Sequence, residues 1–219
     1  MLNYNKLETI PLVSVPVSKF SYSNFLSEVE KQYFRQYTNF GPRRDDEPYI
    51  SDTYSLFDDE VLFNLKIKFD TAIRHYVEHT LCTPELQFKI TGSWFTKNTR
   101  STKHAYHCHP NVMLSAVTYF DDSLLENDEI PGIMFFNKKL SNVFPAFKFD
   151  FKDVKTTQWN IFNYENYTIN PKLNDVLIFP GHLFHQSTVN NSDCRFCIGA
   201  NYFLTGSIGS NSTFSSLTM

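Results

Sequence analysis

The sequence predicts a mainly β protein, a sandwich or barrel of short strands with helices packed on its outside. Three observations lead to this fold class. The chain has 219 residues, of which 42% are hydrophobic. A single all-β domain of this length is ordinary and buries about 70% of its unfolded surface. Apolar residues recur at helical spacings before residue 85 and alternate with polar ones from residue 86 to 205. Turn residues, rather than helices, separate the alternating segments.

Residues 1–85 are expected to form a helical support region for the β core. Asp58-Asp59-Glu60 opens an amphipathic stretch of about five or six turns, and its negative charge suits the positive end of a helix dipole. The apolar positions that recur three or four residues apart are Leu62, Leu65, Phe69, Ile73 and Val77. A shorter helix is predicted over residues 23–37, and a polar loop over residues 41–48.

Residues 86–205 are expected to form the β core, so that the whole chain, 1–219, makes one domain. Segments rich in Val, Ile, Phe, Tyr and Thr predict six strands, at 88–95, 112–120, 132–136, 175–179, 184–189 and 195–203. Pro131-Gly132, Pro180-Gly181 and residues 190–193 supply turns between them.

The segment 137–170 does not follow this alternation. Its aromatic residues are Phe144, Phe147, Phe149, Phe151, Trp159, Phe162, Tyr164 and Tyr167. Loops longer than about 12–15 residues without secondary structure are uncommon and often serve as lids. Two interpretations carry equal weight: a lid or substrate wall, and an extra hairpin packed on the sheet.

The composition excludes several classes of partner. A net charge of −3 and a pI near 6.1 give no general attraction to nucleic acid or to anionic membranes. No apolar run approaches the ~20 residues of a membrane helix, and Pro11 and Pro16 interrupt the apolar stretch near the start, so we expect no signal peptide. The four cysteines are then expected as reduced thiols of a cytoplasmic protein.

His107 and His109 stand just before a predicted strand. In an extended chain, residues two apart point to the same side, and this face continues with Asn111, Met113, Ser115, Val117 and Tyr119. Burying two imidazoles without partners is costly. A bound metal satisfies them, and so does a hydrogen-bonded pair within the core.

The other histidines differ in their surroundings. His185 opens a predicted strand and is the candidate third member of the group, whereas His182 lies in the preceding turn and is expected to face solvent or a loop. His75 and His79 are four apart on the predicted long helix. They lack the intervening Glu of His-Glu-x-x-His, so a solvated helix face is favoured for them.

Arg195 begins the inward-facing row of the last predicted strand. Alternation places it on one face with Cys197, Gly199, Asn201 and Phe203. Arg is rarely fully buried unless it is paired, so either an internal salt bridge or a bidentate anionic ligand is expected. Cys194 and Cys197 would face opposite sides of this strand, which argues against a structural zinc site.

The order of these motifs resembles the Fe(II)/2-oxoglutarate-dependent oxygenases, and among them a group found in bacteria and bacteriophages. If the gene is a phage's, the resemblance implies a place in the host's cytoplasm. The corresponding segments are Ser93-Trp94-Phe95, His107-Cys108-His109-Pro110-Asn111, 115–120, 170–180, His185 and 195–201. They cover about residues 90–203. The resemblance implies a double-stranded β-helix, that is, a jelly roll or cupin-like fold in which the N-terminal helices support one sheet.

The resemblance also implies a reaction. The protein would bind Fe(II), 2-oxoglutarate and O2, release succinate and CO2, and hydroxylate a small-molecule or peptide substrate. It implies His107, His109 and His185 as iron ligands and Arg195 as the residue that binds the C5 carboxylate of 2-oxoglutarate. Tyr119, Ser115 and Asn201 are further candidates for binding the co-substrate, and Trp94 is expected to pack over the site.

One departure from the family pattern concerns the metal ligands. The usual set contains two histidines and one Asp or Glu, whereas His109 stands where the carboxylate is expected. Three neutral ligands leave the site one charge more positive, which alters its redox potential and anion affinity. In one alternative only His107 and His185 bind iron, and in another His109 pairs with Asn111 and His107 lies outside the ligand set. Asp121 and Asp122 are weaker carboxylate candidates.

Two other functions stay open at this point. A three-histidine iron site of the cupin type oxidises a bound thiol or diketone without 2-oxoglutarate, and Arg195 then has no assigned role. A jelly-roll binding module without enzyme activity would not take up Fe(II) stoichiometrically.

Overall fold

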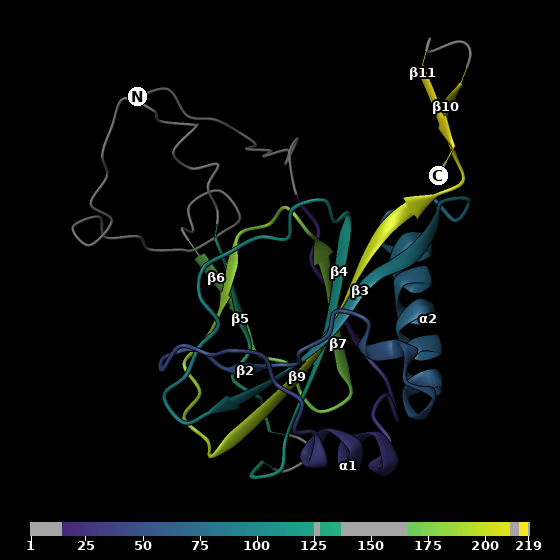
Figure 1. The fold of residues 1–219 in the computed structure, drawn as a ribbon. Coiled ribbons are helices and arrows are strands. Elements are labelled where there is room, and N and C mark those ends of the chain that lie inside the picture. Colours follow the sequence, from purple (N-terminus) through teal and green to yellow (C-terminus); the bar gives the residue numbers. More distant parts are fainter. Residues whose placement is uncertain (1–14, 125–127, 137–165, 211–214, 219) are drawn as a thin grey trace, which may run out of the picture.

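The computed structural model describes residues 15–124, 128–136, 166–210 and 215–218. Two antiparallel sheets lie face to face, and the helices cover the outer face of the larger one (Figure 1). The predicted mainly β architecture with helices on its outside is confirmed. Within the described part of the chain, no helix is both long and apolar enough to cross a membrane.

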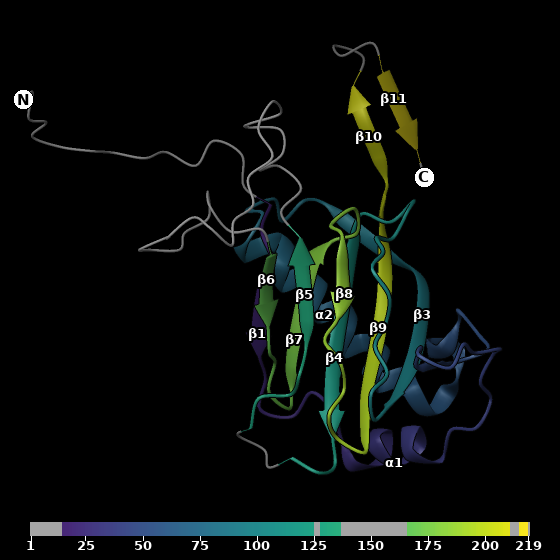
Figure 2. The ribbon, with the colours of Figure 1, turned by 90° about the vertical axis from the view of Figure 1, so that its left-hand side faces the viewer.

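The larger sheet has six strands in the order β1-β7-β4-β9-β3-β2. Their bounds are Ser18–Ser21 (β1), Tyr49–Ile50 (β2), Gln87–Thr99 (β3), Leu114–Asp121 (β4), Asp175–Pro180 (β7) and Cys194–Thr205 (β9). The smaller sheet has the order β6-β5-β8, formed by Asn166–Ile169, Ile133–Phe136 and His185–Ser187. A separate hairpin, β10 (Ser207–Ser210) and β11 (Ser215–Thr218), extends beyond the end of β9 (Figure 2).

All six predicted strands are present, as β3, β4, β5, β7, β8 and β9. The strands that the sequence did not predict are β1, β2, β6, β10 and β11, each of two to four residues. Such short segments give too little alternation to be recognised. Of the aromatic segment 137–170, residues 137–165 lie outside the described residues, while residues 166–169 form β6 at the edge of the smaller sheet.

The strand β4 is buried on both faces, along all eight of its residues. Leu114, Ala116 and Phe120 pack into the core between the larger sheet and the helices. Val117 and Tyr119 point to the other side, into a second core between the two sheets. The interior of the protein therefore has two layers, and the inner face of β4 looks into the space between the sheets.

The helices begin later than the sequence predicted. The longer one, α2, spans Phe63–His79 and follows two short 3-10 turns, η1 (Leu56–Asp58) and η2 (Glu60–Leu62). The Asp59 side chain caps η2 by accepting a hydrogen bond from the backbone N–H of Val61 (3.0 Å). The shorter helix, α1, spans Glu28–Gln36 because Ser27 and Glu30 form a capping box at its start.

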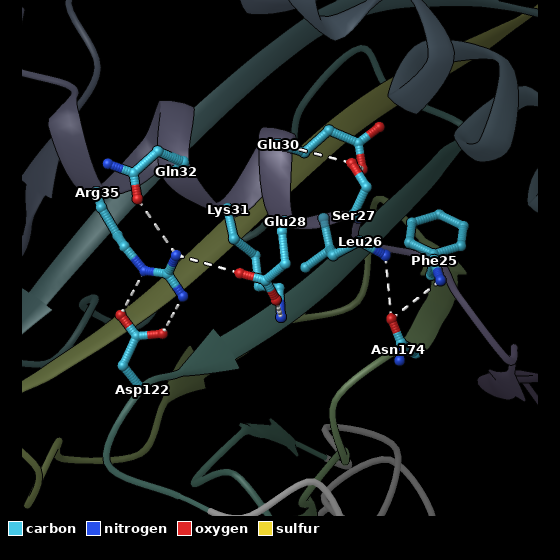
Figure 3. A network of polar contacts seen from close by, with 10 residues as sticks. All are labelled: Phe25, Leu26, Ser27, Glu28, Glu30, Lys31, Gln32, Arg35, Asp122 and Asn174. Carbon is cyan, nitrogen blue, oxygen red and sulfur yellow. Dashed lines mark hydrogen bonds and ion pairs between the residues drawn. The ribbon is translucent and has the colours of Figure 1, made fainter.

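Polar contacts attach α1 to the larger sheet at two places (Figure 3). The side-chain oxygen of Asn174 accepts hydrogen bonds from the backbone N–H groups of Phe25 (2.9 Å) and Leu26 (3.0 Å). Arg35 donates to both carboxylate oxygens of Asp122, at 2.8 and 2.7 Å, beside the end of β4. These contacts hold α1 on the outer side of the larger sheet, whose other face packs against the smaller sheet.

Candidate metal centre and co-substrate pocket

The backbone brings His107 and His185 directly opposite each other. The N–H of His107 donates to the carbonyl of His185 (2.9 Å), and the N–H of His185 donates back to the carbonyl of His107 (2.8 Å). The N–H of His109 donates to the carbonyl of Gly181 (2.8 Å), so residues 107–109 run alongside β8 and the turn before it. One ligand atom of each of the three imidazoles lies within 4.8 Å of the others.

The predicted register did not hold all the way back from β4 to these histidines. Asn111 has a φ of 60°, in the left-handed region, so the chain turns there instead of continuing as a strand. Met113, predicted on the inner face, is 43% exposed. His107 and His109 share a side because they are extended and paired with residues 181–185, whereas Ser115 and Tyr119 are directed inward by β4 itself.

Each imidazole uses its Nδ1 atom for a hydrogen bond within the protein. His107 Nδ1 lies 2.7 Å from the carbonyl of Ala105, and His185 Nδ1 lies 2.7 Å from the carbonyl of Leu183. His109 Nδ1 lies 3.0 Å from Asn201 Oδ1 and 2.6 Å from Ser115 Oγ. A carbonyl oxygen only accepts, so Nδ1 carries the proton and the lone pair resides on Nε2.

The Nε2 atoms of the three imidazoles point toward one another, and each offers an uncharged lone pair to a metal. Those of His107 and His109 are 3.2 Å apart. Burial lowers the pKa of His109 to about 4 and of His185 to about 3, and the neighbouring His107 adds to both effects. Burial also lowers the pKa of His107 itself. The three side chains are therefore uncharged at neutral pH and have their lone pairs available.

This donor set fits an iron ion. Two nitrogens bound to one metal at ~2.1 Å, with their bonds at right angles, lie about 3 Å apart, close to the separation of the two Nε2 atoms. Imidazole nitrogen suits iron, and hydrogen bonds from the second ring nitrogen to protein oxygens are typical of histidines that bind metals. Among the described residues, this is the one group of three or more His, Cys, Asp or Glu that could hold a metal.

The residues considered as alternative metal ligands or partners of His109 form other contacts. Asp121 accepts hydrogen bonds from Ser123 (2.6 Å) and Ser192, and Asp122 pairs with Arg35. His109 is bonded to Asn201 and Ser115, where one alternative had paired it with Asn111.

Arg195 lies in the same pocket and is completely buried. Its terminal nitrogens donate to the carbonyls of Pro131 and Thr188 (3.1 Å to Thr188), to Thr188 Oγ1 (3.2 Å) and to Asn98 Oδ1 (3.4 Å). Its Nε–H is buried and has no hydrogen-bond partner among the residues that the structure describes. No carboxylate among the described residues forms an ion pair with it, which rules out an internal salt bridge within that part of the chain.

These features fit the co-substrate. A buried guanidinium that forms no direct ion pair is costly, and a carboxylate ligand compensates for that cost. The orphaned Nε–H offers a donor to such a ligand. The far carboxylate of 2-oxoglutarate meets both requirements.

Trp94 forms part of the pocket wall, where its ring meets that of His109 edge to face at 5.4 Å between centroids. It lies close against Gly199 of β9. A Cβ atom at Gly199 would come within 2.3 Å of Trp94 Cζ2, so a glycine is required there. Tyr119 also lines the pocket, and burial raises its pKa well above the ordinary value.

One pocket residue, His104, was given no role from the sequence. Its ring lies 4.3 Å from that of His107, between centroids, and it lines the pocket. Its place three residues before His107 was the available signal, but spacing alone does not show which way a loop residue points.

The remaining sequence predictions concern residues outside the pocket. His182 is exposed, as expected. His75 is half-buried and hydrogen-bonded to the hydroxyl of Tyr22 (3.0 Å), so it is not simply solvated. Cys194 and Cys197 pack into the two separate cores, on opposite sides of β9 as predicted, and both are free thiols.

Fold and site together define a non-haem iron oxygenase that uses an oxo acid. Residues 92–201, half of the chain, match the family described as "Putative 2OG-Fe(II) oxygenase". The protein belongs to this family: it is a 2-oxoglutarate-dependent oxygenase that uses Fe(II), 2-oxoglutarate and O2. A search of curated proteins found no match.

Solved oxygenase structures share the fold. A 2OG-Fe(II) oxygenase family oxidoreductase from Burkholderia pseudomallei superposes with a TM-score of 0.55 at 8% identity, covering 85% of this chain and 83% of that one. HygX from Streptomyces hygroscopicus, bound to nickel, 2-oxoglutarate and hygromycin B, gives 0.56 at 10% identity, with coverage of 86% and 82%. A prolyl hydroxylase from Trichoplax adhaerens, in complex with a peptide fragment, gives 0.54 at 13%, with coverage of 85% and 83%. The expected jelly-roll fold is thereby confirmed.

Proposed function

We propose that His107, His109 and His185 hold the iron through their Nε2 atoms and that Arg195 binds the C5 carboxylate of 2-oxoglutarate. The observation that carries this proposal is the use of all three Nδ1 atoms in hydrogen bonds within the protein, which leaves the three Nε2 lone pairs for one metal. When bound, iron and 2-oxoglutarate supply the oxidation: O2 is divided between succinate and the substrate, and CO2 is released.

The surrounding residues hold these groups in position. The carbonyls of Ala105 and Leu183 accept from the Nδ1–H groups of His107 and His185, which fixes the two rings and raises the basicity of Nε2. Asn201 does the same for His109, while Ser115 donates its hydroxyl proton to Asn201 (2.8 Å). We therefore assign Ser115 and Asn201 to the support of His109 and leave Tyr119 as the candidate contact to the co-substrate.

Arg195 is held by oxygens that carry no full charge. Carbonyl, hydroxyl and amide oxygens from Pro131, Thr188 and Asn98 orient the guanidinium but leave its charge for a ligand. Because the pocket is buried, the attraction between this charge and a carboxylate is stronger than it would be in water.

The substrate is proposed to be a small molecule or a peptide side chain that is hydroxylated at a C–H bond. HygX and the prolyl hydroxylase, which share the fold, are bound to hygromycin B and to a peptide, respectively. The net charge of −3 gives no general attraction to nucleic acid. We place the protein in the cytoplasm, since its four cysteines are free.

If the protein were an iron dioxygenase that does not use 2-oxoglutarate, Arg195 would have no function. If it were a binding module without enzyme activity, the three histidines would have none. The Nε–H of Arg195, which has no partner in the described part of the chain, favours the 2-oxoglutarate enzyme.

An anaerobic titration with Fe(II) and then 2-oxoglutarate tests the proposal, followed by assay of succinate after admission of O2. We expect one Fe(II) per chain and a visible metal-to-ligand charge-transfer band. Arg195→Gln should keep the iron but bind 2-oxoglutarate at least about 100-fold more weakly, because a buried charge pair is lost. The control is Arg100→Gln, since Arg100 pairs with Asp193 at the surface. Absence of Fe(II) uptake, or succinate release independent of Arg195, would reject the proposal.

A further inference from the structure

We propose that His104 is a further residue that binds the co-substrate. Its imidazole N–H donates a hydrogen bond to the carboxylate of 2-oxoglutarate that lies beside the metal, while Arg195 holds the other carboxylate. This inference rests on the proposed function and adds a contact that no motif in the sequence indicated.

His104 occupies a place between the proposed metal ligands and Arg195. Three contacts follow one another along β8 and the residue after it. The first residue of β8 is paired with the metal ligand His107, and Ser187 is hydrogen-bonded to the backbone of His104. The next residue, Thr188, accepts hydrogen bonds from Arg195. A co-substrate that chelates the metal at one end and reaches Arg195 at the other therefore passes His104.

The ring of His104 belongs to the metal end of this pocket. It lines the pocket, and its centroid lies 4.3 Å from that of His107, with an angle of 34° between the two ring planes. The hydrogen bonds that Arg195 forms within the described part of the chain go to other residues. The carboxylate assigned to His104 is therefore the one beside the metal.

The ring nitrogens of His104 are available for such a contact. Each of the three proposed metal ligands has its Nδ1 atom bonded to a protein oxygen. Neither ring nitrogen of His104 has a hydrogen-bond partner among the described residues, and its hydrogen bonds there are made by its backbone. A polar side chain in a pocket is expected to have a partner, and a carboxylate oxygen supplies one.

Ser187 holds the backbone of His104 in both directions. The N–H of His104 donates to Ser187 Oγ (2.7 Å), and the N–H of Ser187 donates to the carbonyl of His104 (3.2 Å). Both neutral tautomers of an imidazole carry one N–H. His104 therefore offers a hydrogen-bond donor in a fixed position next to the proposed metal site.

The test measures binding of the co-substrate rather than turnover. The protein is loaded with Co(II), and its affinity for 2-oxoglutarate is measured by isothermal titration calorimetry. His104→Phe keeps an aromatic ring beside His107 but has no donor. It should bind Co(II) like the wild type and 2-oxoglutarate at least about tenfold more weakly, because a hydrogen bond to a charged group is lost.

Two further variants separate the hydrogen bond from packing. The side-chain amides of His104→Asn and His104→Gln lie near the positions of Nδ1 and Nε2, respectively, and neither variant has an aromatic ring. The variant whose amide N–H takes the position of the imidazole donor should bind 2-oxoglutarate within about threefold of the wild type. Binding by both amide variants that is as weak as that of His104→Phe would show that the ring acts by packing on His107, and would overturn the proposal.

Oxalate identifies the carboxylate that His104 contacts. This ligand chelates a metal through its carboxylate oxygens but lacks the far end that reaches Arg195. His104→Phe should weaken the binding of oxalate and of 2-oxoglutarate by similar factors, whereas Arg195→Gln should weaken the binding of 2-oxoglutarate alone. An unchanged affinity of His104→Phe for oxalate would contradict the assigned contact.

The outcomes also distinguish this inference from the proposed function. The control is His75→Phe, a substitution on α2, which should bind Co(II) and both ligands like the wild type. Failure of the wild type to bind Co(II) or 2-oxoglutarate would reject the proposed function itself. Normal binding of both by the wild type, with an unchanged affinity for 2-oxoglutarate in His104→Phe, would reject only the contact from His104. Loss of Co(II) from His104→Phe would also reject it, since His104 would then act on the metal.

Discussion

His107 and His185 exchange two backbone hydrogen bonds, of 2.9 and 2.8 Å, and their rings lie 4.3 Å apart. The pairing of the two proposed ligands thus belongs to the backbone and does not depend on their side chains or on a metal. It links the loop before β4 to the start of β8, two segments that are distant in the sequence.

Because the bridge is made by the backbone, His185→Ala should fold but fail to bind Fe(II) stoichiometrically. His107→Ala should behave in the same way. Fe(II) titration measures the iron and circular dichroism measures the fold. The control is His75→Ala, which removes a histidine of α2 that is hydrogen-bonded to Tyr22 and should keep the iron. Stoichiometric iron in one of these variants would show that the imidazole it lacks is not a required ligand.

Asn201→Ala should weaken metal binding about 10–100-fold, which is typical when the hydrogen-bond partner of a metal-binding histidine is removed. Asn201 Oδ1 lies 3.0 Å from His109 Nδ1, and its loss lets the ring reorient. Competition with a chelator measures the affinity. Asn191→Ala, in the exposed turn before β9, should have no effect. An unchanged affinity in Asn201→Ala would mean that Asn201 does not support a ligand.

Gly199→Ala should destabilise the protein by about 1–3 kcal/mol, the usual cost of overpacking. The new methyl group would meet the Trp94 ring at 2.3 Å, and that ring packs edge to face against His109. Urea unfolding measures this loss of stability. Adding Trp94→Leu to the Gly199→Ala variant should remove most of the destabilisation that Gly199→Ala causes. Gly92→Ala is the matched control, because a Cβ there meets Tyr54 O at an ordinary 3.6 Å. Equal effects at the two glycines would argue against the close contact with Trp94.

The pairing of Asp122 with Arg35 should contribute to stability in a pH-dependent way. The hydrogen bond from Arg35 holds the pKa of Asp122 below its usual value. The stabilisation is therefore fully present above the unfolded-state pKa of about 3.9 and is lost as the pH falls through the lower folded-state value. Since the pair is partly exposed, Asp122→Asn should cost no more than about 1 kcal/mol at pH 7.

Unfolding by urea at several pH values tests this. The difference between wild type and Asp122→Asn should be constant from pH 7 to pH 5 and shrink below about pH 4. A difference that grows on acidification would contradict the assigned direction of the pKa shift.

Much of the fold was accessible from the sequence because strand-forming residues act locally. Alternation located β3, β4, β5, β7, β8 and β9, and the spacing of Leu65, Phe69 and Ile73 located α2. The capping box that starts α1 at Ser27 and the 3-10 turns before Phe63 shifted the helix boundaries, since caps depend on which side-chain hydrogen bonds form.

The sequence by itself determined the types of residue available for the site: histidines two apart before one strand, a histidine opening another, and an arginine on the next. These types and their order follow from local pattern and motif. Only the tertiary structure decided how they are used. Long-range backbone pairing aligned His107 with His185 in place of the register expected from β4. Asn201 and Ser115, which lie on different strands, form hydrogen bonds with His109. The structure also showed that Arg195 forms no ion pair within the described part of the chain. Such contacts join residues far apart along the chain, and no local periodicity encodes them.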